Sequence, residues 1–138
     1  MYKLVNASVD NIELIKNIKI EIITASDNEV DNYEELIEYV DNSVKESIDL
    51  YKLIIINGCI SGIFLKKDFD NYTLIDEIYI YDEYRKHGIA SDIIRSIDAK
   101  NIHLWVYKNN ESAINLYKKS GFNIIDETNT RFRMKKEN

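Results

Sequence analysis

Cysteine, histidine and long apolar runs are scarce in this chain of 138 residues, and each scarcity excludes a class of protein. Cys59 is the single cysteine, so no internal disulfide can form and a reducing compartment, by default the cytoplasm, is expected. With two histidines beside it, no Cys or His cluster is available for a transition metal, and we expect no metal site. Apolar runs such as Leu53–Ile56 are far too short to cross a bilayer, and the first residues do not follow a signal-peptide pattern.

Proline is absent altogether, and no repeat, low-complexity tract or linker is visible. The length suits one domain with one core. A composition of 45% apolar and 30% charged residues is typical of a soluble globular protein. We therefore expect residues 1–138 to form a single domain.

Acidic residues outnumber basic ones, and the formal net charge at pH 7 is −6. Residues 1–50 hold 12 acidic and 4 basic side chains, whereas residues 85–138 hold 6 acidic and 11 basic ones. A net acidic chain is a poor general binder of nucleic acid, because that binding depends on neutralising many phosphates. The basic C-terminal half could hold a small polyanion and the acidic N-terminal half suits a cationic partner, although solvated helix faces would give the same pattern.

The spacing of the apolar residues predicts the element order β-α-α-β-β-β-α-β-α-β-β. Asn57-Gly58 is a hairpin signal between two β-rich runs, and Gly121 is a helix stop. An antiparallel meander followed by a β-α-β crossover predicts an α/β (α+β mixed sheet) fold, with about six to seven strands flanked by about four helices. The predicted strands are 3–7, 50–56, 60–65, 73–81, 102–107, 122–126 and 130–135, and the predicted helices are 9–23, 33–48, 89–97 and 110–120.

The segment between the fourth predicted strand and the third predicted helix has the chemistry of an anion site. The first N–H groups of a helix have no internal partner and carry a partial positive charge. Arg85, Lys86 and His87 add basic side chains, Gly88 lets the backbone approach a phosphate, and the small Ala90 leaves the first turn uncrowded. A capped helix entry with a solvated basic loop would show the same residues.

Two separated motifs resemble those of the GNAT acetyltransferase superfamily. Residues 85–90 are similar to its Arg/Gln-x-x-Gly-x-Gly/Ala signature. Residues 110–122 resemble its Asn-x-x-Ala-x-x-Leu-Tyr-x-x-x-Gly-Phe segment. Residues 77–84 resemble its fourth strand and the approach to the loop, and residues 131–135 its closing strand. The chain is therefore identified as a member of this superfamily, and a GNAT-like acyl-CoA N-acyltransferase fold is expected.

The resemblance implies acetyl-CoA as co-substrate. It implies that the fourth and fifth strands splay apart and that the backbone of Ile78, Tyr79 and Ile80 pairs with the pantetheine arm. Asn110 would touch the pantetheine, although a plain helix N-cap would equally explain this residue. The residues implied to surround the pyrophosphate are Arg85, Lys86, His87, Gly88, Ile89, Ala90 and Ser91.

The resemblance also implies two catalytic residues. Tyr117 matches the helix tyrosine that protonates the departing CoA thiolate; outside the motif it would be interpreted as core packing. Glu77 is the candidate base, acting through water, because an amine attacks only when neutral; a structural or substrate-orienting carboxylate is the alternative. Strand alternation divides the neighbouring side chains between two faces, with Glu77, Tyr79 and Tyr81 on one and Asp76, Ile78 and Ile80 on the other.

Three positions depart from the family pattern. Lys86-His87 stands where a glycine is frequent, which makes the turn less permissive, and Asp82 replaces a usual proline. Trp105 lies on the fifth strand, where enzymes that acetylate ribosomal-protein N-termini carry a catalytic glutamate. These departures leave CoA binding intact and weaken any transfer of substrate identity.

We expect an N-acetyltransferase that moves an acetyl group from acetyl-CoA to a primary amine by direct attack in a ternary complex. The acceptor, a small amine, a peptide N-terminus or a lysine, is expected to be cationic and to bind near residues 20–35 and 66–72. A non-catalytic acyl-CoA-binding sensor and an enzyme acting on charged tRNA are the alternatives, and the acidic charge disfavours the second. Nucleic acid and membrane partners are not expected, and a homodimer stays open because many relatives pair.

Overall fold

The computed structural model describes residues 1–25 and 30–138, and within them the predicted order of elements is confirmed. The predicted boundaries lie within three residues of the observed ones. The strands are β1 (Tyr2–Asn6), β2 (Lys52–Ile56), β3 (Cys59–Asp68), β4 (Thr73–Ile80), β5 (Asn101–Tyr107), β6 (Asn123–Glu127) and β7 (Arg131–Glu137). The α-helices are α1 (Ile12–Ala25), α2 (Tyr33–Ser47), α3 (Ile89–Ser96) and α4 (Glu111–Lys119), and short 3-10 helices cover Val9–Asn11 and Asp82–Tyr84.

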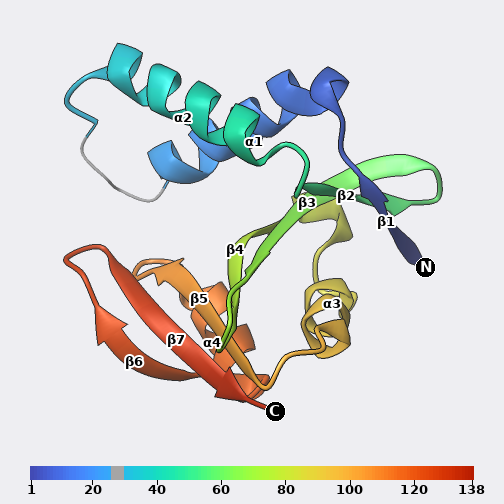
Figure 1. Ribbon diagram of the computed structural model, residues 1–138, viewed down its shortest axis with the longest axis vertical. Coiled ribbons are helices and arrows are strands. Elements are labelled where there is room, and N and C mark those ends of the chain that lie inside the picture. Colours follow the sequence, from blue (N-terminus) through green and yellow to red (C-terminus); the bar gives the residue numbers. More distant parts are fainter. Residues whose placement is uncertain (26–29) are drawn as a thin grey trace.

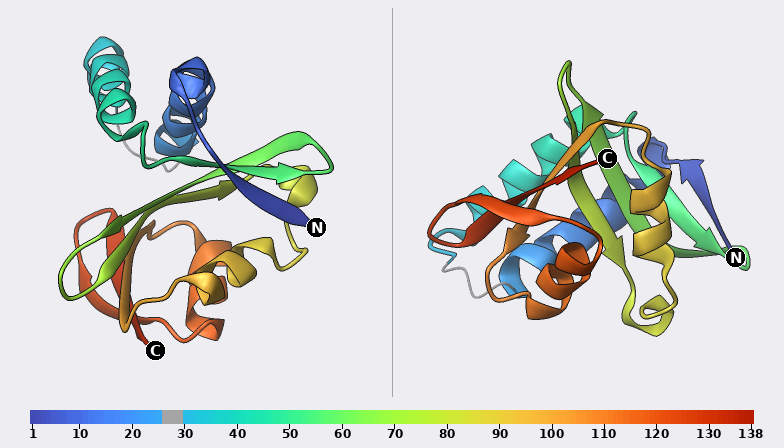
Figure 2. Two further views of the ribbon diagram at one scale, coloured as in Figure 1. Left: turned by 45° about the vertical axis from the view of Figure 1, so that its right-hand side comes forward. Right: turned by 90° about the horizontal axis from the view of Figure 1, so that it is seen from below.

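The strands form one mixed sheet in the order β1-β2-β3-β4-β5-β7-β6. All neighbouring strands are antiparallel except β4 and β5, which are parallel and connected through α3. Helices α1 and α2 cover one face of the sheet, and α3 and α4 cover the other (Figures 1 and 2). The predicted α/β architecture is therefore confirmed, with helices on both faces.

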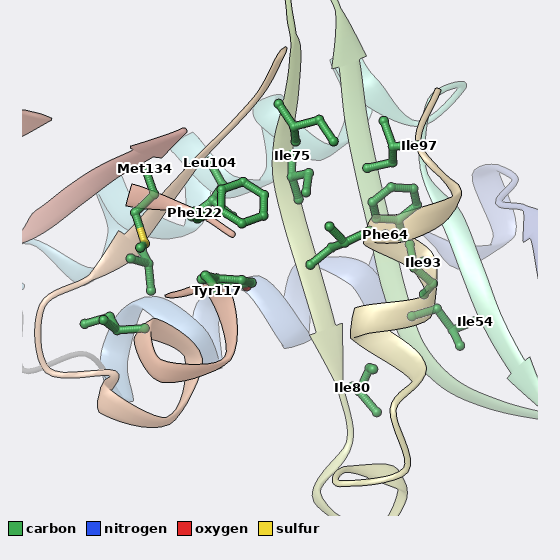
Figure 3. Packing of buried hydrophobic residues seen from close by; sticks show 14 residues of the cluster. Ile54, Phe64, Ile75, Ile80, Ile93, Ile97, Leu104, Tyr117, Phe122 and Met134 are labelled. Atoms are coloured by element: carbon green, nitrogen blue, oxygen red, sulfur yellow. The ribbon is translucent and has the colours of Figure 1, made fainter. Parts of the chain in front are cut away.

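Two hydrophobic clusters hold the layers together. Under α1 and α2 the cluster is centred on Ile15, Val40 and Ile63, which are fully buried. On the other face, α3 and α4 pack on β3, β4, β5 and β7 around residues such as Ile93 and Met134 (Figure 3). Each helix contributes residues three or four positions apart, as expected for one apolar stripe facing a sheet.

Two turns adopt the backbone conformations that the sequence predicts. Asn57 and Gly58 have φ values of 51° and 79°, the pair of positive angles that a two-residue hairpin requires between β2 and β3. Gly121 has a φ of 101°, and the N–H of Phe122 donates to the carbonyl of Tyr117 at 2.9 Å. This glycine conformation closes α4 and turns the chain into β6.

A β-bulge interrupts the alternation of side chains along β4. The register with β3 passes from Leu65↔Glu77 to Lys66↔Ile75, so Asp76 is the extra residue. Ile75 and Ile78 consequently pack in the same cluster although they are three positions apart. The predicted alternation of side chains holds from Glu77 onward. The face predicted for Asp76 assumed an unbroken strand, and the bulge removes that assumption.

Across residues 1–25 and 30–138, no helix combines the length and the apolar character that crossing a membrane requires.

Candidate active site

Strands β4 and β5 begin side by side and then diverge (Figure 1). Their parallel pairing covers three positions and ends at Ile75↔Leu104, while β4 continues to Ile80 and β5 to Tyr107. In the described part of the chain no other strand pairs with that edge of β4. Because neighbouring strand residues direct their polar groups to opposite edges, Tyr79 bonds to Ile63 of β3, and the divergence leaves the backbone N–H and C=O groups of Ile78 available to an extended ligand.

A cavity of about 860 Å³ lies at this divergence. It is bounded by the free edge of β4, the loop that leads into α3, one side of α4, and residues near the end of α1. All the residues predicted to bind the co-substrate line it except His87, which is exposed. These lining residues are Ile78, Tyr79, Ile80, Arg85, Lys86, Gly88, Ile89, Ala90, Ser91 and Asn110.

The loop before α3 is shaped by two residues with positive φ. Gly88, at 77°, is the N-cap of α3 and offers no side-chain cap, so the first N–H groups of the helix keep no side-chain partner there. The N–H of Asp92 is the first to donate within the helix, to the carbonyl of Gly88 at 3.0 Å. A Cβ at Gly88 would have no atom within 4 Å, so the space above the helix start is open. An anion can therefore approach these N–H groups.

Lys86 explains how the loop turns without the glycine that is frequent in the family. Its φ is 65°, in the left-handed region that glycine adopts at little cost. For a residue with a Cβ this conformation costs about 1–2 kcal/mol. The loop therefore keeps the turn, at a cost in stability, and gains a cation beside the cavity.

Arg85 is directed back toward β4. Its Nε donates to the carbonyl oxygen of Ile80 at 2.6 Å, and its Nη1 lies 2.5 Å from Oδ1 of Asp82. Its guanidinium also lies 5.2 Å from the ring centre of Tyr79. The side chain thus fixes the loop to the end of β4, and Arg85 also lines the cavity.

Tyr117 projects from α4 toward the sheet, as Figure 3 shows. It is 8% exposed, and its ring packs edge-on against Phe122 at 5.8 Å. Burial raises the pKa of its hydroxyl to about 12, so the phenol is protonated at neutral pH. Asn110 starts the same helix, and its Oδ1 accepts from the N–H of Ala113 at 3.2 Å. Asn110 is therefore a helix N-cap that also lines the cavity.

A second cavity of about 460 Å³ opens on the side of α1 and α2. It is lined by Glu77 and Asp76 of β4, and it shares Ile78, Tyr107 and Tyr117 with the first cavity. Tyr117 thus stands where the two cavities meet.

Glu77 is the buried carboxylate of the second cavity. Its side chain is 12% exposed, and Nζ of Lys19 lies 3.8 Å from its Oε2. Burial raises the pKa of Glu77 to about 7, and the opposing effect of the Lys19 ammonium is smaller. The carboxyl is therefore half ionised near neutral pH, which suits a group that accepts and returns protons.

Several residues of the second cavity escape sequence reasoning. Lys19 belongs to the helical pattern of α1, Trp105 was considered only as a replacement on the fifth strand, and Arg131 only as part of a closing strand. Of the segments expected to build the acceptor pocket, residues 20–35 contribute Ile22 and Ile23 and residues 66–72 contribute no lining residue, while residues 26–29 lie outside the described part of the chain. The positive charge of Arg131 is visible in the sequence, but no neighbouring residue indicates that it lies near β4.

No group of three or more His, Cys, Asp or Glu side chains in the described ranges is arranged to hold a metal ion. His103 accepts at Nδ1 from Nη2 of Arg133, 2.9 Å away, and Cys59 is exposed at the start of β3. Neither residue lines either cavity.

Comparison with known proteins places this chain in a family. The model of the Acetyltransferase (GNAT) domain family matches residues 49–124, more than half of the chain. Over the whole chain the fold is similar to the PaiA N-acetyltransferase of Thermoplasma acidophilum in complex with coenzyme A, with a TM-score of 0.75, 16% identity and 99% of that chain covered. It is also similar to an N-acetyltransferase of Staphylococcus aureus Mu50, with a TM-score of 0.73, 14% identity, and 96% of this chain and 99% of that chain covered.

A third similar structure, a GNAT family acetyltransferase of Elizabethkingia anophelis with acetyl-CoA bound, has a TM-score of 0.60 and 16% identity, with 70% of this chain and 82% of that chain covered. At these identities the structural likeness establishes the fold, and the match to the family model establishes the membership. The chain is an acetyltransferase that belongs to the GNAT family.

Proposed function

We propose that this acetyltransferase moves the acetyl group of acetyl-CoA to a primary amine by direct attack, with both substrates bound at once. The observation that carries the proposal is the meeting of two cavities at Tyr117, one beside the free edge of β4 and the other containing Glu77. The first cavity holds the donor and the second holds the acceptor. Acetyl-CoA, when bound, supplies the acetyl thioester.

The donor cavity matches the chemistry of a diphosphate joined to a pantetheine arm. The N–H groups that open α3, with the positive end of the helix dipole, favour the diphosphate, and Lys86 adds a cation. The unpaired backbone of Ile78, on the free edge of β4, can bond to an amide group of the arm as an added strand would. We assign His87 no contact with the diphosphate, because it is the one residue between Arg85 and Ser91 that does not line the cavity.

Glu77 prepares the acceptor. A lysine-like amine has a pKa of about 10.4, so deprotonating it at pH 7 costs about 4–5 kcal/mol. The carboxylate of Glu77, with a pKa of about 7, accepts that proton directly or through water and passes it to solvent. Asp76 lines the same cavity, and its carboxylate and that of Glu77, although paired with Lys67 and Lys19, can also accept hydrogen bonds from an acceptor that arrives as an ammonium ion.

Tyr117 completes the transfer. The neutral nitrogen attacks the thioester carbonyl carbon, the N–C bond forms, and the C–S bond breaks with its electron pair going to sulfur. Tyr117 gives its proton to that sulfur and regains one from the nitrogen, so the reaction releases one proton overall. A thiol has a pKa of about 8.5 in water, below that of the buried phenol at about 12, so Tyr117 gives its proton to the sulfur only as the more acidic protonated nitrogen replaces it.

The test is release of free CoA thiol from acetyl-CoA with a panel of amines and peptides. We expect Tyr117→Phe to lower kcat by about 100-fold, since a positioned acid contributes about 10²–10⁴. CoA binding, measured by calorimetry, should be nearly unchanged. Tyr33→Phe is the matched control, because this tyrosine is 54% exposed on α2 and lines neither cavity.

Normal turnover by Tyr117→Phe would show that another group protonates the thiolate. Failure of every acceptor to release thiol would contradict the proposed reaction.

We also propose that the enzyme works in the cytoplasm. Cys59 is free and exposed, and such a thiol persists in a reducing compartment.

A further inference from the structure

Two guanidinium groups lie on one indole ring beside the acceptor cavity. The guanidinium carbon of Arg131 is 5.0 Å from the ring centre of Trp105, and that of Arg133 is 5.3 Å from the same ring. The β5–β7 register brings these residues together, because Trp105 pairs with Arg133 and Tyr107 with Arg131. Stacking on an aromatic ring orients a guanidinium and leaves its positive charge uncompensated.

Arg131 is the charged residue of the cavity without an opposite charge beside it. In the described part of the chain, Lys19 pairs with Glu77 at 3.8 Å, and Asp76 pairs with Lys67 at 3.3 Å. No ion pair there includes Arg131, although it lines the cavity. The cavity therefore holds a base at one strand and an unmatched cation two strands away.

The neighbours of Arg131 increase this positive charge. Arg133 donates from Nε and Nη2 to Nδ1 of His103, at 3.2 and 2.9 Å, so its bonded partner is a ring and not a carboxylate. Burial, with the nearby charges of Arg133 and Lys135, lowers the pKa of His103, so this ring is neutral at pH 7. Two like charges held this close repel each other, and an anion between them or beside them would remove that cost.

We propose that the acceptor is an amine that also carries an anionic group, a carboxylate or a phosphate, and that Arg131 binds this group while the amine faces Glu77. The inference rests on the proposed function and adds the chemical class of the acceptor to it. The planar fork of a guanidinium forms two parallel hydrogen bonds to either anion. The amine end still arrives as a cation, so the acceptor as a whole is zwitterionic.

The strand order sets the approximate spacing within the acceptor. Glu77 on β4 and Arg131 on β7 are separated by β5, so their backbones are about 10 Å apart where strands are paired, and farther apart where β4 and β5 diverge. The long arginine side chain spans part of that distance. Test acceptors should therefore cover several amine-to-anion separations.

The experiment uses acceptors in matched pairs that differ in the anion alone. α-Amino acids and ω-amino acids of increasing length are compared with their carboxamides, and aminoalkyl phosphates with the corresponding amino alcohols. For the best pair we expect the anionic acceptor to have a kcat/KM about 10- to 100-fold higher, the range for hydrogen bonds between charged groups. The two kinds of pair distinguish a carboxylate from a phosphate.

Arg131→Gln should bring that ratio close to one by raising the KM of the anionic acceptor, and Arg131→Lys should restore part of it. Lys135→Gln is the matched control. It removes one positive charge from the same strand, but Lys135 pairs with Glu137 at 3.2 Å and does not line the cavity. This control should keep the wild-type ratio.

Calorimetric binding of the same pairs to the CoA-loaded protein decides the inference without turnover. Tighter binding of the anionic member, abolished in Arg131→Gln, would support it. Equal binding of both members, or a preference that Arg131→Gln leaves unchanged, would overturn it. Turnover of amines without that preference would overturn this inference alone, whereas the absence of thiol release with every acceptor would count against the proposed reaction.

Discussion

Glu77 shows how one buried side chain links stability to catalysis. Burial raises its pKa from 4.5 to about 7, so the folded protein binds the proton more tightly than the unfolded chain does. The stabilisation associated with this proton is complete below pH 4.5 and is lost as the pH rises through 7. A pKa difference of this size lowers the free energy of unfolding above pH 7 by about 3 kcal/mol relative to acidic pH. The proposed base therefore destabilises the fold at the pH where the proposed reaction runs.

Glu77→Gln should separate these two effects. Because glutamine does not ionise, we expect the variant to gain up to about 3 kcal/mol relative to wild type between pH 5 and pH 8.5, measured by urea unfolding at both values. In the same interval kcat/KM of the wild type should rise with an apparent pKa of about 7, and the variant should lose most activity and that pH dependence.

Glu13→Gln is the control for Glu77→Gln, since Glu13 has an exposed side chain on α1 outside both cavities. A wild-type activity profile that is flat across neutral pH would contradict the role given to Glu77. An unchanged difference in stability between the two pH values would contradict its burial.

Lys86 and Arg85 show how single residues shape the loop before α3. The turn that Lys86 makes with φ 65° is normally made by glycine, so sequence reasoning expected a less permissive loop. In the structure Lys86 itself adopts the left-handed backbone conformation, so the turn still forms. The bonds of Arg85 to Ile80 and Asp82 were equally invisible in the sequence, because they depend on where β4 ends relative to the loop.

Among the elements, β4 decides the geometry of the site. It pairs with β3 over its length, carries the bulge at Asp76, and leaves β5 after Ile75. A bulge increases the local twist of a strand, which accounts for the departure of β4 from its parallel neighbour. Because the register depends on the partner residues Leu65 and Lys66 of β3, the spacing of apolar residues on β4 alone could not reveal the bulge.

Gly62 of β3 permits the close approach that holds β4 in this position. A Cβ at Gly62 would lie 2.1 Å from the carbonyl oxygen of Tyr79 and 3.0 Å from Cα of Ile80, so the two backbones would have to separate. We expect Gly62→Ala to destabilise the protein by at least about 2 kcal/mol, measured by urea unfolding. Cys59→Ala, at the exposed start of the same strand, should change the stability by less than about 0.5 kcal/mol. Equal stability of the two variants would show that β3 and β4 can separate freely.

At the scale of the whole molecule, both proposed cavities are assembled from segments that are far apart in the chain. The proposed donor cavity is built mostly by residues 78–119, from the segments that carry the family motifs, together with residues of α1. The proposed acceptor cavity shares α1 and adds residues of α2 and β7. Pairing of two chains stays a prediction that light scattering in solution can test.

Binding of the donor should stabilise the whole domain. Acetyl-CoA at 100 times its dissociation constant should add about 2.7 kcal/mol to the free energy of unfolding and raise Tm by several degrees. Ala90→Glu puts a carboxylate beside the first N–H groups of α3 and should remove this shift, because it occupies and repels the diphosphate position. Ser96→Glu, in the exposed last turn of the same helix and outside the cavity, should keep it. A Tm unaffected by acetyl-CoA in the wild type would contradict the donor site.

Local patterns in the chain predict the order of the elements, the hairpin at Asn57-Gly58, the end of α4 at Gly121 and the position of the loop before α3. These features follow from interactions between residues close together in the chain, which periodicity and motif spacing record. The tertiary structure alone decided the bulge at Asp76, the divergence of β4 from β5, and the meeting of Lys19, Glu77, Trp105 and Arg131 around one cavity. The physical reason is that strand register and the packing of helices on a sheet join residues that are far apart in the chain, and no local pattern encodes which of them will meet.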